Sequence, residues 1–308
     1  MSEPVALVVG EALMDVVRTA DGTIQHRPGG SPANVAVGLA RLGVSTELLC
    51  SLGPEARGAA LRAHLAAAGV VLRSPTAPAP SATSTAEARL DADGAASYHF
   101  DISWDPGPFE AGPVRLLHTG SLAAVVEPGA HEVVAALAAA DPGTLISLDP
   151  NVRPSLGLGP EQVRARCELA ARHAHVVKMS DEDLSWMYPG ASIDRVAERL
   201  HGLGVRLLVV TRGAQGCVLA APGWRSELPA PSVPVVDTIG AGDSFMSGLL
   251  FAILTSGGDS GLRTGTVHRH QAEAWARIAL RSAAITVGRA GAQPPLAEEL
   301  PQEVAAAV

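Results

Sequence analysis

The 308-residue sequence predicts a doubly wound α/β fold: a mostly parallel sheet with helices on both faces, plus a small antiparallel β lid. Short aliphatic and β-branched runs alternate with alanine-rich helical runs over most of the chain. Hydrophobic residues make up 47% of the sequence, enough to bury a large core. One segment, before residue 104, breaks the alternation. We therefore expect a single domain over 1–308.

The alternation begins near the N-terminus. Residues 5–10 and 46–51 are expected strands, and residues 32–42 and 55–68 are expected helices. Strands that are separated by helices usually pair in parallel, because the helix carries the chain back along the sheet. The first third of the chain therefore predicts a parallel sheet.

The same pattern continues through the middle of the chain. Four further strands are expected at 114–118, 144–149, 175–179 and 207–211. Three helices are expected between them, at 129–140, 161–172 and 193–203.

The segment that breaks the alternation contains two neighbouring β-type runs, 83–90 and 95–101. They are joined by Asp-Ala-Asp-Gly at 91–94, a typical turn sequence. This pattern predicts an antiparallel hairpin that projects from the main sheet. With residues 16–27, the stretch 82–103 is expected to form a lid.

Composition excludes several classes of partner and compartment. A net charge of −8 disfavours general binding to nucleic acid or to an anionic membrane. No run approaches the ~18 apolar residues of a membrane span, and the N-terminus lacks a basic export signal. The three cysteines lie far apart and suggest neither disulfides nor a zinc site. We expect a cytoplasmic protein that binds small molecules.

The most informative segment is 237–250, where a turn of small residues runs directly into an apolar helix. A helix N-terminus offers free backbone N–H groups and a partial positive charge. Gly240, Ala241 and Gly242 can therefore form an anion hole for phosphate. Asp243, in the first turn, is positioned to accept a proton from a nearby hydroxyl. The alternative is that Asp243 only caps the helix and that the glycines only make a turn.

A second helix start has complementary chemistry. Residues 29–34 read Gly-Gly-Ser-Pro-Ala-Asn, with Ser31 as a natural N-cap. Gly29 and Gly30 allow a ligand to approach the backbone, and Asn34 offers both a donor and an acceptor. Two such sites in one chain favour a functional interpretation of both.

Segments 29–43 and 237–248 closely resemble the two signatures of the ribokinase-like, or PfkB, carbohydrate kinases, in order and separation. The opening at 10–15 looks most like bacterial fructokinases. The resemblance implies ATP and Mg²⁺ as cofactors. It also implies that Asp15, Gly29, Gly30 and Asn34 bind sugar hydroxyls, and that Asp243 deprotonates the attacking hydroxyl.

Two further segments resemble the family in order along the chain. Residues 149–154 are similar to a fructokinase segment in which Asn151 and Arg153 would face the substrate and phosphates. A proline-bounded loop is the alternative. Residues 178–184 look like the family's Asn-x-x-Glu element, which orders magnesium and phosphate. Here Ser180 and Asp183 replace the usual residues, so any Mg²⁺ contact of Asp183 would run through water.

The resemblance also implies a nucleotide site and a monovalent cation site. Thr211 and Gly213 would lie by the phosphates, and Gly216 would let the chain turn. Lys178, Ser180 and Gly242 would also belong to the nucleotide site. A plain hairpin is the alternative for 211–216. Asp237 and the backbone around Ile239 would hold K⁺. Some relatives dimerise through the lid, so a homodimer is one expectation.

Other motifs fail. The lone Lys178 follows Val177, which excludes a Walker A loop. The pairs His173/His175 and His268/His270 have no nearby carboxylate or cysteine to complete a metal site, so surface histidines are expected.

The sequence therefore predicts an ATP-dependent sugar kinase with fructose as the favoured acceptor. The alternative acceptors are 2-keto-3-deoxygluconate, ribose or a nucleoside. Two other classes of protein stay open: a noncatalytic sugar sensor, and a serine hydrolase with Ser244 as nucleophile.

Overall fold

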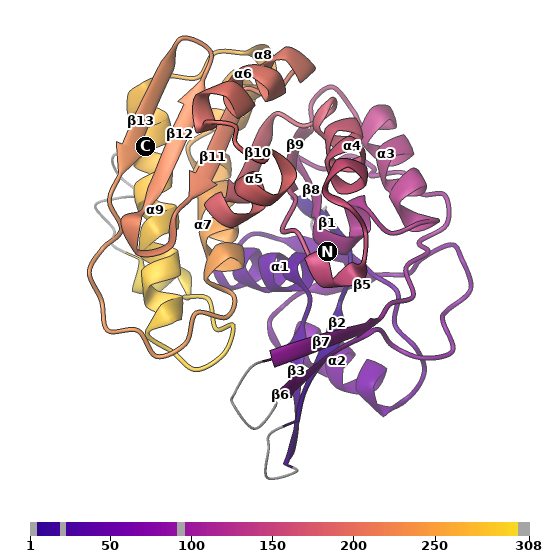
Figure 1. Cartoon of the computed structure of the whole chain (residues 1–308). Coiled ribbons are helices and arrows are strands. Elements are labelled where there is room, and N and C mark those ends of the chain that lie inside the picture. Colours follow the sequence, from indigo (N-terminus) through magenta and orange to yellow (C-terminus); the bar gives the residue numbers. More distant parts are fainter. Residues whose placement is uncertain (1–4, 19–22, 91–95, 301–308) are drawn as a thin grey trace.

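The computed structural model describes residues 5–18, 23–90 and 96–300. The predicted turn at 91–94 lies outside these residues. In the described part, a nine-stranded sheet forms the centre of the molecule, in the order β13-β12-β11-β10-β9-β8-β1-β4-β5 (Figure 1). These strands are β1 (Ala6–Val9), β4 (Thr46–Leu49), β5 (Val71–Arg73), β8 (Leu116–Gly120), β9 (Leu145–Asp149), β10 (Val176–Ser180), β11 (Leu207–Thr211), β12 (Cys217–Ala221) and β13 (Trp224–Leu228).

Every pair from β5 to β11 is parallel, and β12 and β13 add an antiparallel edge. This arrangement confirms the predicted fold class. All six strands that the alternation predicts for this sheet are present, whereas β5, β12 and β13 were not predicted. The missed strands are short or belong to an edge hairpin, so they give a weak periodic signal.

Helices cover both faces of the large sheet. They are α1 (Ser31–Arg41), α2 (Ala56–Ala67), α3 (Gly129–Ala139), α4 (Pro160–Ala171), α5 (Asp181–Met187), α6 (Ile193–Leu203), α7 (Ala241–Thr255), α8 (Gly258–Thr264) and α9 (Arg269–Val287). Along β1, Ala6 and Val8 join the core beneath α1, α7 and α9, while Leu7 and Val9 join the core beneath α3, α4 and α6. Successive side chains of a strand point to opposite faces, so one strand supports both cores.

A smaller sheet of the described residues projects from one end of the molecule, in the order β3-β2-β6-β7 (Figure 1). Its strands are β2 (Leu13–Arg18), β3 (Ile24–Gly29), β6 (Thr85–Leu90) and β7 (Ala96–Asp101). It consists of two antiparallel hairpins, β2–β3 and β6–β7. The central pair, β2 and β6, is parallel and joins the two hairpins, which come from separate parts of the chain.

The order of the large sheet reverses at β1, where the chain proceeds to β4 on one side and later pairs β8 on the other. Ligands of open α/β sheets bind at the carboxyl ends of strands where the order reverses. Glu11 follows β1 and Ser121 follows β8 at this edge. Ser121 and Asn151 both have left-handed backbone angles, with φ of 52° and 39°. Such strain in residues other than glycine is concentrated at functional sites.

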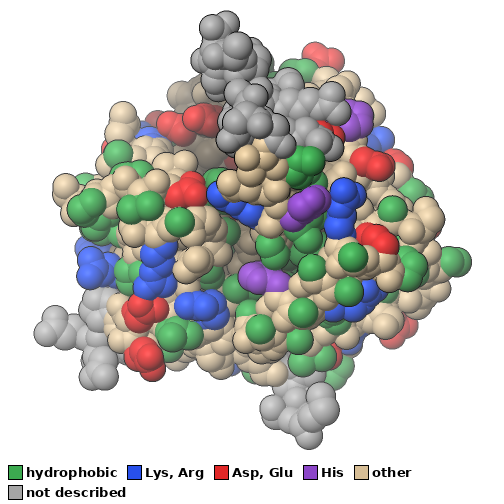
Figure 2. Space-filling model, turned by 90° about the horizontal axis from the view of Figure 1, so that it is seen from below, with side chains coloured by type: hydrophobic (Ala, Val, Ile, Leu, Met, Phe, Trp, Pro, Cys, Tyr) green, Lys and Arg blue, Asp and Glu red, His purple; other side chains and the backbone are tan. Residues whose placement is uncertain are grey.

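No helix in the described part of the chain is long and apolar enough to cross a membrane. From the side of the smaller sheet, acidic and basic side chains are interspersed over the surface (Figure 2).

Candidate active site

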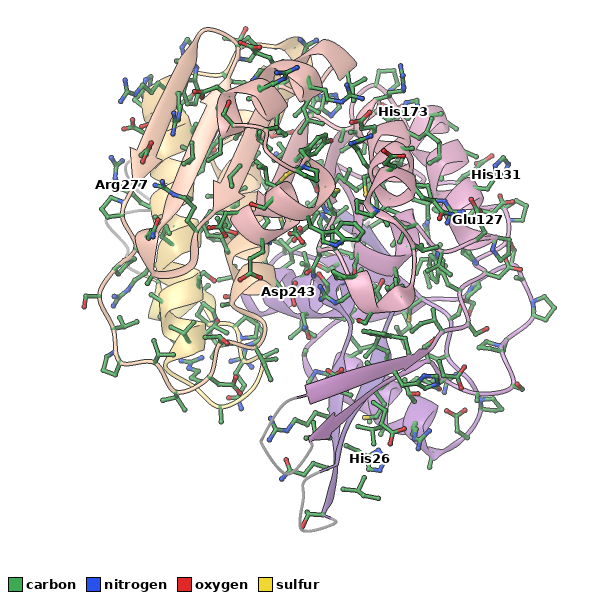
Figure 3. All side chains as sticks on the ribbon, viewed as in Figure 1. His26, Glu127, His131, His173, Asp243 and Arg277 are labelled. Carbon is green, nitrogen blue, oxygen red and sulfur yellow. The ribbon has the colours of Figure 1, made fainter. Side chains whose placement is uncertain are left out.

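Asp243 lies where α7 begins, in the middle of the molecule between the large sheet and the smaller one (Figure 3). Gly240, in the left-handed conformation at φ 75°, turns the chain into the helix and places Asp243 in the first turn. Asp243 is 8% exposed. Its Oδ1 accepts a hydrogen bond from Ser31 Oγ at 2.7 Å, and its Oδ2 accepts one from Asn34 Nδ2 at 2.8 Å. The two segments that the sequence singled out therefore meet at one carboxylate.

The backbone N–H of Gly242 has no partner among the described residues, whereas that of Ala241 donates to Thr238 O at 3.2 Å. The start of α7 thus keeps at least one free donor beside Asp243. A free N–H at a helix start favours a bound anion.

Gly29 and Gly30 serve the protein's own packing. A Cβ on Gly29 would overlap the carboxylate of Asp15. Gly30 has φ of 103°, and a Cβ there would lie 2.5 Å from Glu11 O. On the side where a Cβ would point, Asp15 and the turn after β1 thus fill the space next to these glycines.

Asp15 faces the same region from β2. Burial raises the pKa of its carboxyl to about 6; the positive charges of Arg153 and Arg27 oppose the shift, and the Asp243 carboxylate adds to it. Asp15, Arg153 and Asp243 are thus electrostatically coupled, although they come from three distant parts of the sequence.

Arg153 and Asn151 form a rigid unit after β9. Arg153 Nη1 donates to the side-chain oxygen of Asn151 at 2.6 Å and to its backbone oxygen at 3.0 Å. The left-handed backbone of Asn151 creates this turn. The guanidinium is therefore fixed in position before any ligand arrives.

Lys178 lies in the middle of β10 and is 4% exposed. Its Nζ donates to Asp149 Oδ2 at 2.8 Å. A Cβ on Gly242 would lie 3.0 Å from Nζ, so the ammonium abuts the start of α7. Burial raises the pKa of Asp149 to about 6 against the lowering effect of Lys178. Asp149 was not among the predicted site residues, although it opens the Asp-Pro-Asn-x-Arg segment.

Ser180 and Asp183 form a capping box at the start of α5. Ser180 Oγ accepts from Asp183 N, and Asp183 Oδ2 accepts from Ser180 N, both at 2.9 Å. Asp183 Oδ1 also accepts from Val152 N at 2.8 Å. Both carboxylate oxygens therefore already hold backbone groups, and the two short side chains fit one another as a reciprocal cap.

The predicted nucleotide segment is a hairpin at the same edge of the large sheet. Thr211 ends β11, and Gly213 and Gly216 have φ of 50° and 92°. A Cβ on Gly216 would overlap Leu228 O, so this position requires glycine. Apart from its chain neighbours, no described residue comes within 4 Å of a Cβ placed on Gly213, which leaves that backbone open to a ligand.

Asp237 joins two loops beneath the start of α7. Its Oδ1 accepts from Ile239 N at 3.0 Å and its Oδ2 from Gly291 N at 2.9 Å. These backbone hydrogen bonds hold the pKa of Asp237 below its usual value. Gly240 also packs tightly on Ala292, because a Cβ at residue 240 would lie 2.5 Å from the Ala292 Cβ.

Glu11 and Ser121 were also missed. Glu11 is 4% exposed, and burial raises its pKa to about 7. The neighbouring Ser121 hydroxyl opposes this shift, although Glu11 Oε2 and Ser121 Oγ form no hydrogen bond of ordinary geometry with any described residue. Glutamate and serine are both common in loops, so the sequence does not single them out. Their proximity follows only from the pairing of β1 with β8.

Two alternative sites have poor geometry. Ser244 is 1% exposed and its hydroxyl is paired with Ser282 and Thr286 inside the helical layer, which is no position for a hydrolase nucleophile. His173 lies at the periphery (Figure 3). Among the described residues, no group of three or more potential ligand side chains forms a metal site.

Comparison with known proteins gives one consistent result. A family model described as pfkB family carbohydrate kinase matches residues 5–299. The chain is 34% identical to a fructokinase of Klebsiella pneumoniae over 264 residues, which cover 81% of this chain and 84% of that protein. It is 31% identical to fructokinase-1 of Oryza sativa over 309 aligned positions, 94% of each. The structure of a fructokinase from Xylella fastidiosa with bound ATP matches with a TM-score of 0.79 and 25% identity, covering 98% of this chain and 97% of that one.

Proposed function

Because this chain belongs to the pfkB family of carbohydrate kinases, we propose that it transfers the γ-phosphate of ATP to a sugar hydroxyl, with fructose as the favoured acceptor. The observation that carries the proposal is the position of Asp243. Its carboxylate lies at a glycine-lined helix start and also contacts Asn34, so a base and a phosphate-binding turn share one place.

Asp243 is the general base of the proposed reaction. It takes the proton of the attacking hydroxyl while that oxygen forms a bond to phosphorus, and the bond from phosphorus to the ADP oxygen breaks. The N–H groups at 240–242 stabilise the negative charge on the transferred group, and the N–H of Gly242 is free of partners in the described part of the chain.

The sugar lies between the two sheets. Asp15, Asn34, Asn151 and Arg153 supply its polar contacts, while Gly29 and Gly30 set the positions of Asp15 and the turn after β1. The coupling of Asp15 to Arg153 and Asp243 supports one shared pocket.

The nucleotide lies along the carboxyl edge of β10 and β11. Thr211 and Gly213 approach the phosphates, Gly216 maintains the turn, and Lys178 and Ser180 border the same edge. The open backbone at Gly213 supports this placement.

Mg²⁺ accompanies the phosphates, and the donors present suit an ion held through water. Mg²⁺ keeps most of its waters and needs few protein ligands. Both oxygens of Asp183 already accept backbone hydrogen bonds, so Asp183 would reach the ion through one of those waters. When bound, the ion offsets phosphate charge.

Potassium would bind beside Asp237 and the backbone at Ile239. The ionised Asp237 and the two loops that it joins suit a monovalent cation, which would stiffen the anion hole from beneath. Measuring activity against K⁺ concentration in a sodium buffer tests this site, and equal activity in both salts would exclude it.

The smaller sheet, with segments 16–27 and 82–103, would act as a lid that excludes water from the bound sugar. Leu13 and Ala86 of this sheet pack against Leu122 in the helical turn that follows β8. Its outer strands, β3 and β7, leave sheet edges that could pair in a homodimer, and light scattering of the purified protein would measure that state. We also propose a cytoplasmic location, supported by three unpaired buried cysteines.

The proposal is tested by measuring ADP release with fructose, 2-keto-3-deoxygluconate, ribose and nucleosides, each beside a blank without acceptor. A large stimulation by one of them supports a kinase, and fructose is expected to give the highest kcat/KM. A protein that binds sugar without releasing ADP would instead be a noncatalytic sensor.

A further inference from the structure

A cavity of about 490 Å³ lies outside the candidate active site, between α4, α6 and the loop 188–192 that joins α5 to α6. These three helices pack on the same face of the large sheet, whereas α7, which carries Asp243, covers the other face (Figure 1). The volume falls within the usual range for sites that bind small molecules. The proposed reaction does not use this cavity.

Three arginines line the cavity. Arg195 and Arg199 are four positions apart on α6 and therefore lie on one side of that helix, and Arg164 comes from the neighbouring α4. Like charges at this spacing destabilise a helix, and a third positive charge from another element adds to the repulsion. In a chain with a net charge of −8, the cavity is thus a local concentration of positive charge.

Glu168 balances only one of these charges. Its carboxylate accepts hydrogen bonds from Arg199 Nε at 2.5 Å, from Arg199 Nη2 at 2.7 Å and from the Tyr188 hydroxyl at 3.0 Å. Burial would raise the pKa of Glu168, but these hydrogen bonds outweigh it and lower that pKa, so the carboxylate stays charged. Among the described residues, no carboxylate forms an ion pair with Arg164 or Arg195. Two positive charges at the cavity therefore remain unbalanced.

Arg164 is held in position before any ligand arrives. Its guanidinium lies 5.9 Å from the centre of the Tyr188 ring, and its Nη1 donates to Met187 O at 3.3 Å. The exposed Arg195 guanidinium, by contrast, donates to no residue in the described part of the chain, so it is free to turn toward a ligand. The planar fork of a guanidinium matches two oxygens of a phosphate group.

We propose that this cavity is a second ligand site, which binds a small phosphate-bearing anion through Arg164 and Arg195. The group recognised is a phosphoryl dianion, whose two charges offset the two unbalanced guanidinium groups. It comes either from free phosphate or from the phosphate ester of a small organic molecule. The proposal does not depend on kinase activity, because none of the residues that line the cavity belongs to the candidate active site.

The rest of the cavity wall distinguishes these two sources. It is formed mainly by apolar side chains, those of Pro189, Ala191 and Val196. An ester whose carbon part packs on this wall removes apolar surface from water, which free phosphate cannot do. An apolar phosphate ester should therefore bind several-fold more tightly than free phosphate.

Calorimetric titration with inorganic phosphate and with phenyl phosphate, at constant ionic strength, tests the proposal. We expect a Kd of ~1 mM for phosphate and a lower value for phenyl phosphate. Arg164→Gln/Arg195→Gln should raise both values about 10-fold or more. Arg195→Gln alone should raise them about 3-fold or more, and its fold is not at risk because the side chain bonds to no described residue.

Arg269→Gln/Arg277→Gln is the matched control. It removes the same two positive charges from α9, where each arginine pairs with Glu273, and Arg277 lies at the opposite edge of the molecule from α4 (Figure 3). Its Kd for phosphate should stay within about 2-fold of wild type. If both double variants weaken binding equally, phosphate responds only to overall charge and the proposal fails.

Hydrogen exchange locates the bound anion. Phosphate should slow amide exchange at 188–199 in wild type and not in Arg164→Gln/Arg195→Gln. Slower exchange at 240–244 without a change at 188–199 would place phosphate in the candidate active site and overturn the proposal. The absence of binding to wild type at 20 times the expected Kd, or an unchanged Kd in Arg195→Gln, would overturn it as well.

Discussion

Asn34 and Asp243 are 209 positions apart in sequence, and a hydrogen bond of 2.8 Å joins their side chains. The bond ties the first helix of the chain to the start of α7. It places an amide that can bind sugar next to the carboxylate that would deprotonate it, so the orientation of the acceptor hydroxyl depends on both residues.

Replacing Asn34 with Ala should impair sugar binding and the orientation of Asp243 without unfolding the protein. The substitution removes one of two donors to Asp243, and Ser31 keeps the other. We expect sugar KM to rise about 10-fold and kcat to fall, with ATP KM nearly unchanged. Initial-rate measurements over both substrates check this. An equal rise in both KM values would contradict it.

Gly242→Ala should stabilise the helix while impairing catalysis. The position is helical, and alanine is preferred to glycine there by about 0.5–1 kcal/mol. The added Cβ pushes against Lys178 Nζ and narrows the anion hole. We expect an unchanged or higher melting temperature and a kcat roughly 10 to 100-fold lower.

The matched control for that change is Gly202→Ala, an exposed glycine in α6 with no atom within 4 Å of the added Cβ. It should give the same gain in helix stability with wild-type kcat. Full activity in Gly242→Ala would show that the turn at 240–242 does not bind the transferred phosphate.

Sugar binding should weaken in acid. Burial raises the pKa of Asp15 to about 6, so its carboxylate dominates at pH 7.5 and the neutral acid dominates at pH 5. If the carboxylate is the better acceptor for sugar hydroxyls, Kd rises as pH falls through 6, by up to ~10-fold at pH 5. Calorimetric titration without ATP measures this. Asp15→Asn should bind weakly with a flatter pH dependence, and an unchanged pH profile in that variant would contradict the assignment.

Asp183 and Ser180 share one capping box, so variants of the two residues should lose similar stability. Comparing their Mg²⁺ requirements therefore tests the metal proposal. Ser180→Ala and Asp183→Asn should each destabilise the protein by about 1 kcal/mol. Only Asp183→Asn removes a negative charge, so only this variant should need several-fold more Mg²⁺ for half-maximal rate. The same Mg²⁺ requirement in both variants would assign Asp183 to capping alone.

If the smaller sheet is a lid, loosening it should weaken the coupling of ATP cleavage to sugar phosphorylation. Phe100 packs against Leu13, Ala86 and Leu122, where the smaller sheet meets the helical turn after β8. Phe100→Ala should loosen this contact, so that ATP hydrolysis without sugar rises relative to sugar phosphorylation. Measuring both rates gives the ratio. An unaltered ratio in a folded variant would argue against a lid function for this sheet.

The sequence predicted the large sheet well because alternating strands and helices leave a strong periodic signal, as at 46–51 and 55–68. It also identified the two helix starts that meet at Asp243. It did not indicate that Asp149 holds Lys178, because this partnership depends on β9 and β10 being neighbours. Nor did it indicate that a Cβ on Gly29 would overlap the Asp15 carboxylate, because no local pattern shows which atom lies there.

The central claim, that Asp243 is the base, is tested most directly by Asp243→Asn, which preserves size and can still pair with Ser31 or Asn34. We expect kcat to fall ~10² to 10⁴-fold while the sugar Kd, measured without turnover, stays within about 3-fold of wild type. Turnover close to wild type in this variant would contradict the account.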